Sequence, residues 1–205
     1  MSHYKIIGRA GAGSLIAEFL LSEAGQDYEI SFVTRAEAST AEFHALNPLG
    51  KIPVLIRPDG TAICETLAIT VHLTEAFPNL APALGTSDRD RYWQYLAMLA
   101  TCIYPAYHRQ HHTRYYAPEA VYDDVRARAR AEQAPAYDFI EATLNPYLLG
   151  ETITAADFYL YMLTRWDLDR DALVAARPKL GSFIKAMRAH PSVDAVIAKQ
   201  KHRPA

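Results

Sequence analysis

The stretch Asn47-Pro48-Leu49-Gly50-Lys51-Ile52-Pro53-Val54-Leu55 decides the fold assignment. A short helical pattern from Thr40 to Leu46 comes before it and is expected to end there, because a proline disfavours helical backbone in the residue that precedes it. After it, Val54 to Ile56 and Thr61 to Ile63 are apolar runs separated by Pro58-Asp59-Gly60. These three residues favour a tight turn, so the two runs are expected to pair as an antiparallel hairpin.

The residues before and after this stretch alternate between strand and helix patterns. A buried strand is predicted for Tyr4 to Ile7, followed by a helix from Leu15 to a stop at Gly25 and by a second strand from Tyr28 to Phe32. A further helix is predicted from about Thr66 to Phe77. The element order is therefore βαβαββα, which is an α/β, thioredoxin-like arrangement.

The remainder of the chain has a helical pattern almost throughout. Helices are predicted at about 88–114, 118–144, 154–169 and 178–190. The segment from Pro78 to Thr86 has two prolines and a glycine but no periodicity, so a linker is expected there, at 79–87. We therefore predict a first domain over 1–78 and an all-helical second domain over 88–205.

Composition narrows the classes of function. The chain has 205 residues and a net charge of −2, which gives no basic surface for nucleic acid. No apolar run approaches the roughly 20 residues needed to cross a bilayer, so no membrane insertion is expected. The only cysteines, Cys64 and Cys102, have no metal-ligand or CxxC spacing, and this usage suits a reducing cytoplasm. His108, His111 and His112 have no carboxylate or cysteine nearby to complete a metal site, so no metal is predicted.

The opening stretch resembles the pattern N-P-x-G-x-V-P-x-L of glutathione transferases, with Ile52 in place of valine. The resemblance implies that Pro53 follows a cis peptide bond and that the backbone of Ile52 pairs with the cysteinyl part of glutathione, as an added strand would. Lys51 is placed in the same site. The alternative is that Pro53 only begins a strand.

The spacing from this stretch to Glu65-Thr66 also fits the family. The segment Glu65-Thr66-Leu67-Ala68-Ile69 resembles E-S-x-A-I, in which the hydroxyl residue at the start of a helix holds the γ-glutamyl carboxylate. A helix N-terminus offers unpaired N–H groups and positive potential to such an anion. Glu65 and Thr66 are therefore predicted to bind glutathione, although Thr66 could also act as an ordinary helix cap.

The resemblance covers both domains, from Tyr4 to about Val193, and is nearest to the bacterial beta-like members. It implies a cytoplasmic, homodimeric enzyme of detoxification that binds glutathione as co-substrate and promotes thiolate attack on a hydrophobic electrophile. A protein of the same fold that binds glutathione without turnover, or that has a structural role, is the alternative. Thr154 and Asp157 resemble the capping box of a buried helix in the family's second domain, which is a structural role.

One position departs from the beta-class pattern. The family's cysteine in G-A-C-S-L corresponds to Gly13 in the segment Gly11-Ala12-Gly13-Ser14-Leu15, so a mixed disulfide at this point is excluded. Ser14 is the first candidate for stabilising the glutathione thiolate, and Arg9 is the second. Tyr4 is a weaker candidate, because its place on the first strand suits burial.

The electrophile pocket has less support in the sequence. Thr101 and Tyr104 align with a serine and a histidine that line the pocket of beta-class members, which places both beside the hydrophobic substrate. An aromatic residue at helical spacing equally suits core packing. Both roles are therefore kept as predictions.

Overall fold

The computed structural model describes residues 3–200 of the chain. Its contacts group these residues into two compact units. The first contains 3–81 together with 188–200, and the second contains 82–187.

The first unit is built on a mixed four-stranded sheet. The strands are β1 (Tyr4–Gly8), β2 (Tyr28–Phe32), β3 (Val54–Ile56) and β4 (Ala62–Cys64), in the order β2-β1-β3-β4. β1 runs parallel to β2 and antiparallel to β3, and β3 and β4 form the predicted antiparallel hairpin. The prediction of β4 was one residue early at each end.

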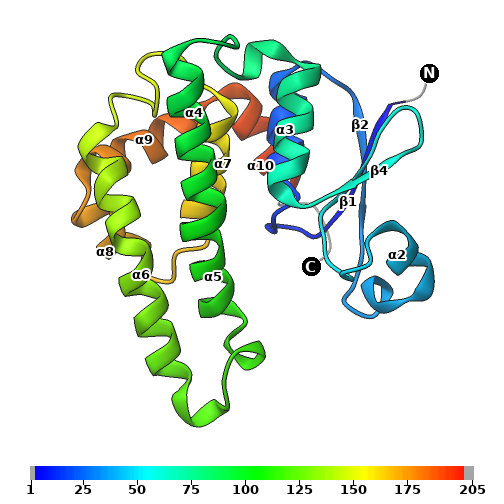
Figure 1. Cartoon of the computed structure of the whole chain (residues 1–205), viewed down its shortest axis with the longest axis horizontal. Helices are drawn as coiled ribbons and strands as arrows, with labels where there is room; N and C mark the ends of the chain where they lie inside the picture. Colours follow the sequence, from blue (N-terminus) through cyan, green and yellow to red (C-terminus); the bar gives the residue numbers. More distant parts are fainter. Residues whose placement is uncertain (1–2, 201–205) are drawn as a thin grey trace. The chain divides into compact units, whose positions relative to one another are not determined.

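Helices cover both faces of this sheet (Figure 1). α1 (Leu15–Glu23) packs against α3 (Thr66–Ala76) on one face, and the short α2 (Ala41–Leu46) lies on the other. Neighbouring residues of β1 divide between the two sides: Ile7 packs with Phe43 of α2, whereas Ile6 points to the opposite face. The thioredoxin-like order βαβαββα is confirmed.

A last helix, α10 (Pro191–Gln200), packs on α1. The sequence prediction left this helix out and counted its residues with the second domain. By contacts, 188–200 groups with the first unit, because the apolar side chains of Val193, Val196 and Ile197 on α10 are buried.

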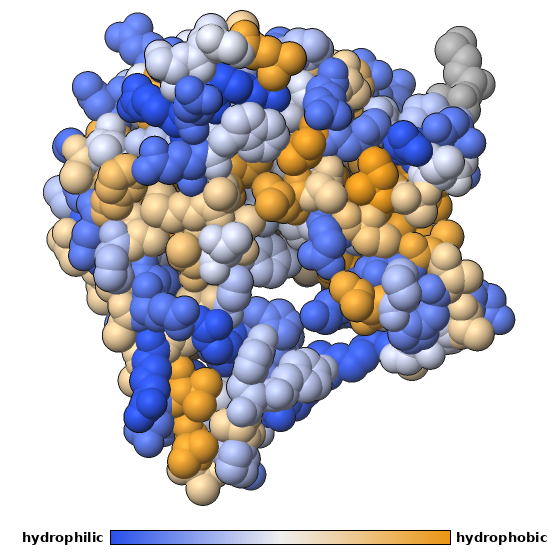
Figure 2. All heavy atoms as spheres, viewed as in Figure 1, coloured by the Kyte–Doolittle hydropathy of each residue, from blue (hydrophilic) through white to orange (hydrophobic). Residues whose placement is uncertain are grey.

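The second unit is helical throughout its regular structure. It contains α4 (Ser87–Met98), α5 (Tyr104–His111), α6 (Tyr122–Thr143), α7 (Ala155–Thr164), α8 (Arg170–Ala175) and α9 (Pro178–Ala189). α5 and α6 pack together as a long hairpin (Figure 1). In Figure 2 this hairpin carries many hydrophilic residues, with hydrophobic ones near its tip.

Two predicted helices of this unit differ in the structure. The predicted helix 88–114 is interrupted by a π-helical turn, Leu99–Ile103, because Pro105 has no N–H with which to continue the regular ladder. The predicted helix 154–169 ends at Thr164, and Asp169 then caps α8, which was not predicted.

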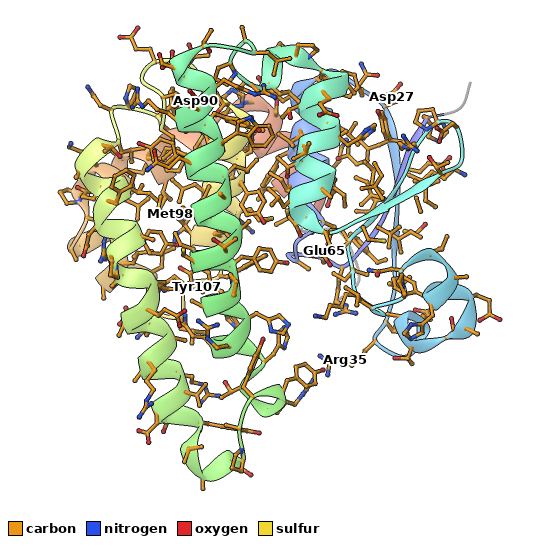
Figure 3. The ribbon with its side chains drawn as sticks, viewed as in Figure 1. Asp27, Arg35, Glu65, Asp90, Met98 and Tyr107 are labelled. Carbon is orange, nitrogen blue, oxygen red and sulfur yellow. The ribbon has the colours of Figure 1, made fainter. Side chains whose placement is uncertain are left out.

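A buried polar network holds the second unit together. The Tyr107 hydroxyl, on α5 (labelled in Figure 3), donates to Oδ2 of Asp167 at 2.7 Å and lies 2.8 Å from the Tyr137 hydroxyl of α6. Burial, and then the proximity of Tyr137 and Asp167, raise the pKa of Tyr107. Its phenol therefore stays protonated and serves as a structural hydrogen-bond donor.

Within the part of the chain that the structure describes, no helix is long and apolar enough to cross a membrane. Residues 3–200 also contain no group of three or more His, Cys, Asp and Glu side chains arranged to hold a metal ion.

Candidate functional site

Strand register brings three segments together at one end of the sheet. Ile7 lies opposite Val54 in the β1–β3 pair, so the loop that follows β1 begins at the same end of the sheet as the segment that precedes β3. Val54 in turn lies opposite Cys64 in the β3–β4 pair. α3, which begins at Thr66 two residues after the end of β4, therefore also starts at this end of the sheet. The loop after β1, the residue before Pro53 and the start of α3 are therefore neighbours.

The loop before β3 is held by Asn47, whose side chain is buried. Its amide Nδ2 donates to the carbonyl oxygen of Lys51 at 2.6 Å, and its Oδ1 accepts the N–H of Leu49 at 3.1 Å. Asn47 belongs to the motif, but no role was predicted for its side chain. Because Asn47 pairs with both sides of the loop, it fixes the approach to Ile52, while the side chain of Lys51 is exposed.

Ile52 presents an open backbone at the start of β3. The Ile52–Pro53 peptide bond is cis, as predicted. The side chain of Ile52 packs on the cluster of Ala38, Phe43 and Val54. Among residues 3–200, neither the N–H nor the C=O of Ile52 has a backbone hydrogen-bond partner. A packed residue with an open N–H and C=O can pair with one rung of an extended peptide.

The N-terminus of α3 is also open. Glu65, labelled in Figure 3, precedes the helix with φ of 69° and ψ of 124°, and it is the only non-glycine residue with positive φ in the described part of the chain. Neither the Glu65 carboxylate nor the Thr66 hydroxyl has a hydrogen-bond partner within residues 3–200, and no side chain caps the helix. The first N–H groups of α3 are thus available to an anion. Backbone strain of this kind is typical of ligand-binding positions.

The loop after β1 is closed by Ser14. Its hydroxyl donates to the carbonyl of Arg9 at 3.1 Å and lies 3.3 Å from the Arg9 N–H, which donates to it. The Ser14 side chain is fully buried, and a Cβ added at Gly8 would lie 2.3 Å from the Ser14 Cβ and Oγ. Ser14 therefore shapes the loop in this structure, and a direct bond from its hydroxyl to a thiol requires that its bond to Arg9 be broken.

Other donors in this loop are available. The backbone N–H groups of Gly13 and Ser14, at the start of α1, have no backbone partner within the described residues. The Arg9 guanidinium donates through Nε to the carbonyl of Val33 at 3.3 Å, and in residues 3–200 it has no ion pair with a carboxylate. The loop after β1 thus carries a positive charge, held near the end of β2, and leads into the N-terminus of α1.

Tyr4 lies at the far end of β1 from this loop. Its hydroxyl is 3.2 Å from Nε2 of His72 on α3, and burial, which outweighs the opposite effect of Arg57, raises the pKa of Tyr4. It packs edge-on against His72 and Phe77. These contacts give Tyr4 a structural place in the sheet.

Thr101 and Tyr104 belong to the second unit. The Thr101 hydroxyl donates to the carbonyl of Ala97 at 2.9 Å, and the Tyr104 ring packs edge-on against Trp166, with 5.0 Å between the ring centroids. Tyr104 also approaches the ring of Tyr159 at 6.4 Å. Their role as pocket residues stays a prediction.

The first unit therefore combines three recognition elements for one kind of ligand. An extended peptide can pair with Ile52, a terminal carboxylate can bind the start of α3, and a nearby cation can reach Glu65. Arg9 and the start of α1 add positive potential, which favours a thiolate over a thiol.

Comparisons with known proteins match both units. Residues 14–76 match the N-terminal domain of glutathione S-transferases, and residues 108–200 match their C-terminal domain. The uncharacterized GST-like protein YncG of Escherichia coli strain K12 is 28% identical over 167 residues, which are 79% of this chain and 81% of YncG.

Solved structures agree with this match. A glutathione transferase homologue from Sulfitobacter with bound glutathione has a TM-score of 0.85 and 27% identity, covering 97% of this chain and 99% of that one. A sphingomonad glutathione S-transferase complexed with glutathione has a TM-score of 0.83 and 27% identity, covering 97% of this chain and 100% of that one. The fold, the two matched domains and these relatives show that the chain belongs to the glutathione transferase superfamily.

Proposed function

We propose that this protein is a glutathione transferase that binds glutathione at the end of its sheet and promotes attack of the thiolate on a hydrophobic electrophile. The observation that carries the proposal is the pair of open polar groups described above: the backbone of Ile52 and the uncapped start of α3 after Glu65. Unpaired polar groups of this kind are costly unless a ligand or water pairs with them.

Each part of glutathione has a partner in this proposal. The cysteinyl N–H and C=O pair with Ile52, beside Pro53. The γ-glutamyl carboxylate accepts from the Thr66 hydroxyl and the first N–H groups of α3, and the γ-glutamyl ammonium pairs with the Glu65 carboxylate. Lys51, which is exposed beside Ile52, is proposed to attract the glycyl carboxylate.

The thiolate needs a source of positive charge, and Arg9 is the proposed one. A cysteine-type thiol has a reference pKa near 8.5, and one charge-assisted hydrogen bond of about 1.5–3 kcal/mol would lower that pKa by roughly one to two units. The hydroxyl of Ser14 is already bonded to the Arg9 backbone. We therefore propose that Ser14 acts by shaping the loop, while Arg9 and the N–H groups at the start of α1 face the thiolate.

Electrophile binding is assigned to Thr101 and Tyr104 as a proposal. The half-buried Tyr104 ring offers an aromatic surface to a hydrophobic substrate. We also propose that the protein works as a homodimer in the cytoplasm and acts in detoxification, with no metal in its mechanism.

Ultraviolet absorbance of the bound thiolate, followed against pH in a saturated complex, tests the proposal. We expect a thiol pKa below 7.5, and Arg9→Gln is expected to raise it by about one unit. Ser14→Ala serves as a comparison, because it removes the hydroxyl that closes the loop but keeps the guanidinium group of Arg9 in the protein. A saturated wild-type complex with an unshifted thiol pKa would contradict the catalytic proposal.

The alternative function is glutathione binding without turnover. Two observations favour it: Gly13 stands where the beta-class members have their cysteine, and the hydroxyl of Ser14 is bonded within the loop. The same titration separates the two functions, since a binding protein would hold glutathione with its thiol pKa near 8.5.

A further inference from the structure

The last residue of α10 contacts the loop that is proposed to receive the thiol. The Gln200 side chain accepts the N–H of Gly11 through Oε1 at 3.1 Å and donates through Nε2 to Oε1 of Glu18 at 2.8 Å. Gly11 lies in the loop that follows β1, and Glu18 is a fully buried residue of α1. One amide thus connects the loop, α1 and α10.

The loop has little side-chain packing to hold this shape. Gly11 has φ of 69°, and a Cβ added there would meet no atom within 4 Å. Gly13 follows two residues later, so the segment combines two residues of high conformational freedom. Hydrogen bonds must therefore fix its course, and Gln200 and Ser14 each supply one, at Gly11 and at Arg9.

Gln200 continues the buried stripe of α10. Val193, Val196 and Ile197 form the buried stripe of α10, and position 200 continues that stripe at helical spacing. An amide occupies a position where the stripe favours an apolar residue, and it lies beside the buried carboxylate of Glu18. At the other end of the helix, the Ser192 hydroxyl donates to Oε2 of Glu23 at 2.5 Å.

We propose that Gln200 is a positioning residue of the glutathione site: its amide bridges Gly11 and Glu18 and so holds the 9–14 loop in the shape that faces the thiol. This inference rests on the proposed function. It makes the C-terminal helix part of the site, although Gln200 is not expected to touch glutathione. Without the bridge, the loop samples other conformations, and its residues no longer keep the places from which they act on the thiol.

The test uses the full chain with Gln200→Ala. In the ligand-free protein, amide hydrogen exchange at Gly11 is expected to rise about tenfold. In the glutathione complex, the thiol pKa is expected to rise toward that of free glutathione. The value of kcat is expected to fall by a larger factor than the factor by which KM changes. Ser192→Ala is the matched control, because it loosens the opposite end of α10 and leaves the bridge in place.

A reciprocal exchange distinguishes positioning from general damage. Gln200→Glu alone sets two carboxylates against each other and is expected to be worse than Gln200→Ala. Combined with Glu18→Gln, it restores a donor and an acceptor, and the thiol pKa should return to the wild-type value. The inference is overturned if Gln200→Ala leaves both the amide hydrogen exchange of Gly11 and the thiol pKa unchanged. It is also overturned if the double variant does not restore the wild-type thiol pKa. Failure of the wild-type protein to bind glutathione would instead overturn the proposed function, and this inference with it.

Discussion

Two helix N-termini in this molecule begin with the same kinds of residue and have opposite arrangements. α7 begins after Thr154 and carries Asp157 in its first turn, and the Asp157 carboxylate accepts from the Thr154 N–H at 2.8 Å and from the Leu148 N–H at 2.9 Å. α3 begins at Thr66 after Glu65, and neither side chain has a partner within the described residues. One start is closed by its own side chains, and the other is left open.

The difference teaches how to separate stability from binding in a polar cluster. Around Asp157 the buried polar groups pair with one another, so the cluster stabilises the fold and offers nothing to a ligand. At Glu65 the backbone is strained and the donors are unpaired, so the segment contributes little to stability and retains its capacity to bind an anion. Substitutions at the start of α7 should therefore lower stability and leave binding intact, whereas substitutions at the start of α3 should weaken binding and leave stability nearly unchanged.

The largest effect is expected for Asp157→Ala. The change leaves the N–H groups of Leu148 and Thr154 buried without their acceptor, which should lower the free energy of unfolding by about 3–5 kcal/mol at pH 7. Denaturant unfolding measures this loss. The control is Asp169→Ala at the exposed cap of α8, where Asp169 accepts the Ala172 N–H, and it should cost only about 1 kcal/mol. Equal losses of unfolding free energy in Asp157→Ala and Asp169→Ala would contradict a special structural role of the buried cluster around Asp157.

The next effect is a pH dependence of stability at the closed helix start. Burial, which outweighs the hydrogen bonds from Leu148 and Thr154, raises the pKa of Asp157 from 3.8 to about 6. A raised pKa in the folded state gives stability that is present below the unfolded pKa and is lost as the pH rises through about 6.

The stability difference between wild type and Asp157→Asn should therefore shift against the wild type by about 2 kcal/mol between pH 4 and pH 7. Denaturant unfolding of both proteins at several pH values measures this shift. Because asparagine does not titrate, the other ionisable groups cancel in the difference. A difference independent of pH would show that Asp157 stays ionised throughout.

A smaller effect, on binding alone, is expected at the open helix start. Thr66→Val replaces a hydroxyl by a methyl group of similar size, so glutathione affinity should fall about tenfold, with unfolding changed by less than about 0.5 kcal/mol. Calorimetric titration measures the affinity. Thr154→Val is the matched control at α7 and should show the reverse: a loss of stability with affinity intact.

The smallest effect concerns the strained backbone of Glu65. Glu65→Gly relieves the positive φ, whereas Glu65→Ala keeps it, so the glycine variant should be more stable than the alanine variant by about 1 kcal/mol. Both variants lose the carboxylate and should bind glutathione more weakly than wild type. If the Glu65→Ala variant proves as stable as the Glu65→Gly variant, the positive φ at this position does not lower the stability of the protein.

The sequence predicted the first unit well because its signals are local. Alternating apolar residues identify the strands, and the contiguous motif from Asn47 to Leu55 forms the loop that contains Ile52 and leads into β3. Glu65 and Thr66 follow directly on the neighbouring strand of the same hairpin. Motif and site therefore coincide.

The features that the sequence did not predict depend on contacts that are distant along the chain. The last predicted helix ended at 190 and none was predicted after it, yet proline is well tolerated at the first position of a helix, and α10 begins at Pro191. The hydroxyl of Ser14 looked available for catalysis, but its burial follows from the close approach of Gly8. The bridge formed by Gln200 joins residues almost at opposite ends of the chain.

The central claim is that the open start of α3, together with Ile52, binds glutathione. Amide NMR shifts during a glutathione titration test it most directly. The account predicts saturable shifts at Ile52 and at Thr66 to Ala68, with none at Ala155 to Asp157. An absence of shifts at Ile52 and Thr66 at millimolar glutathione, or equal shifts at both helix starts, would contradict it.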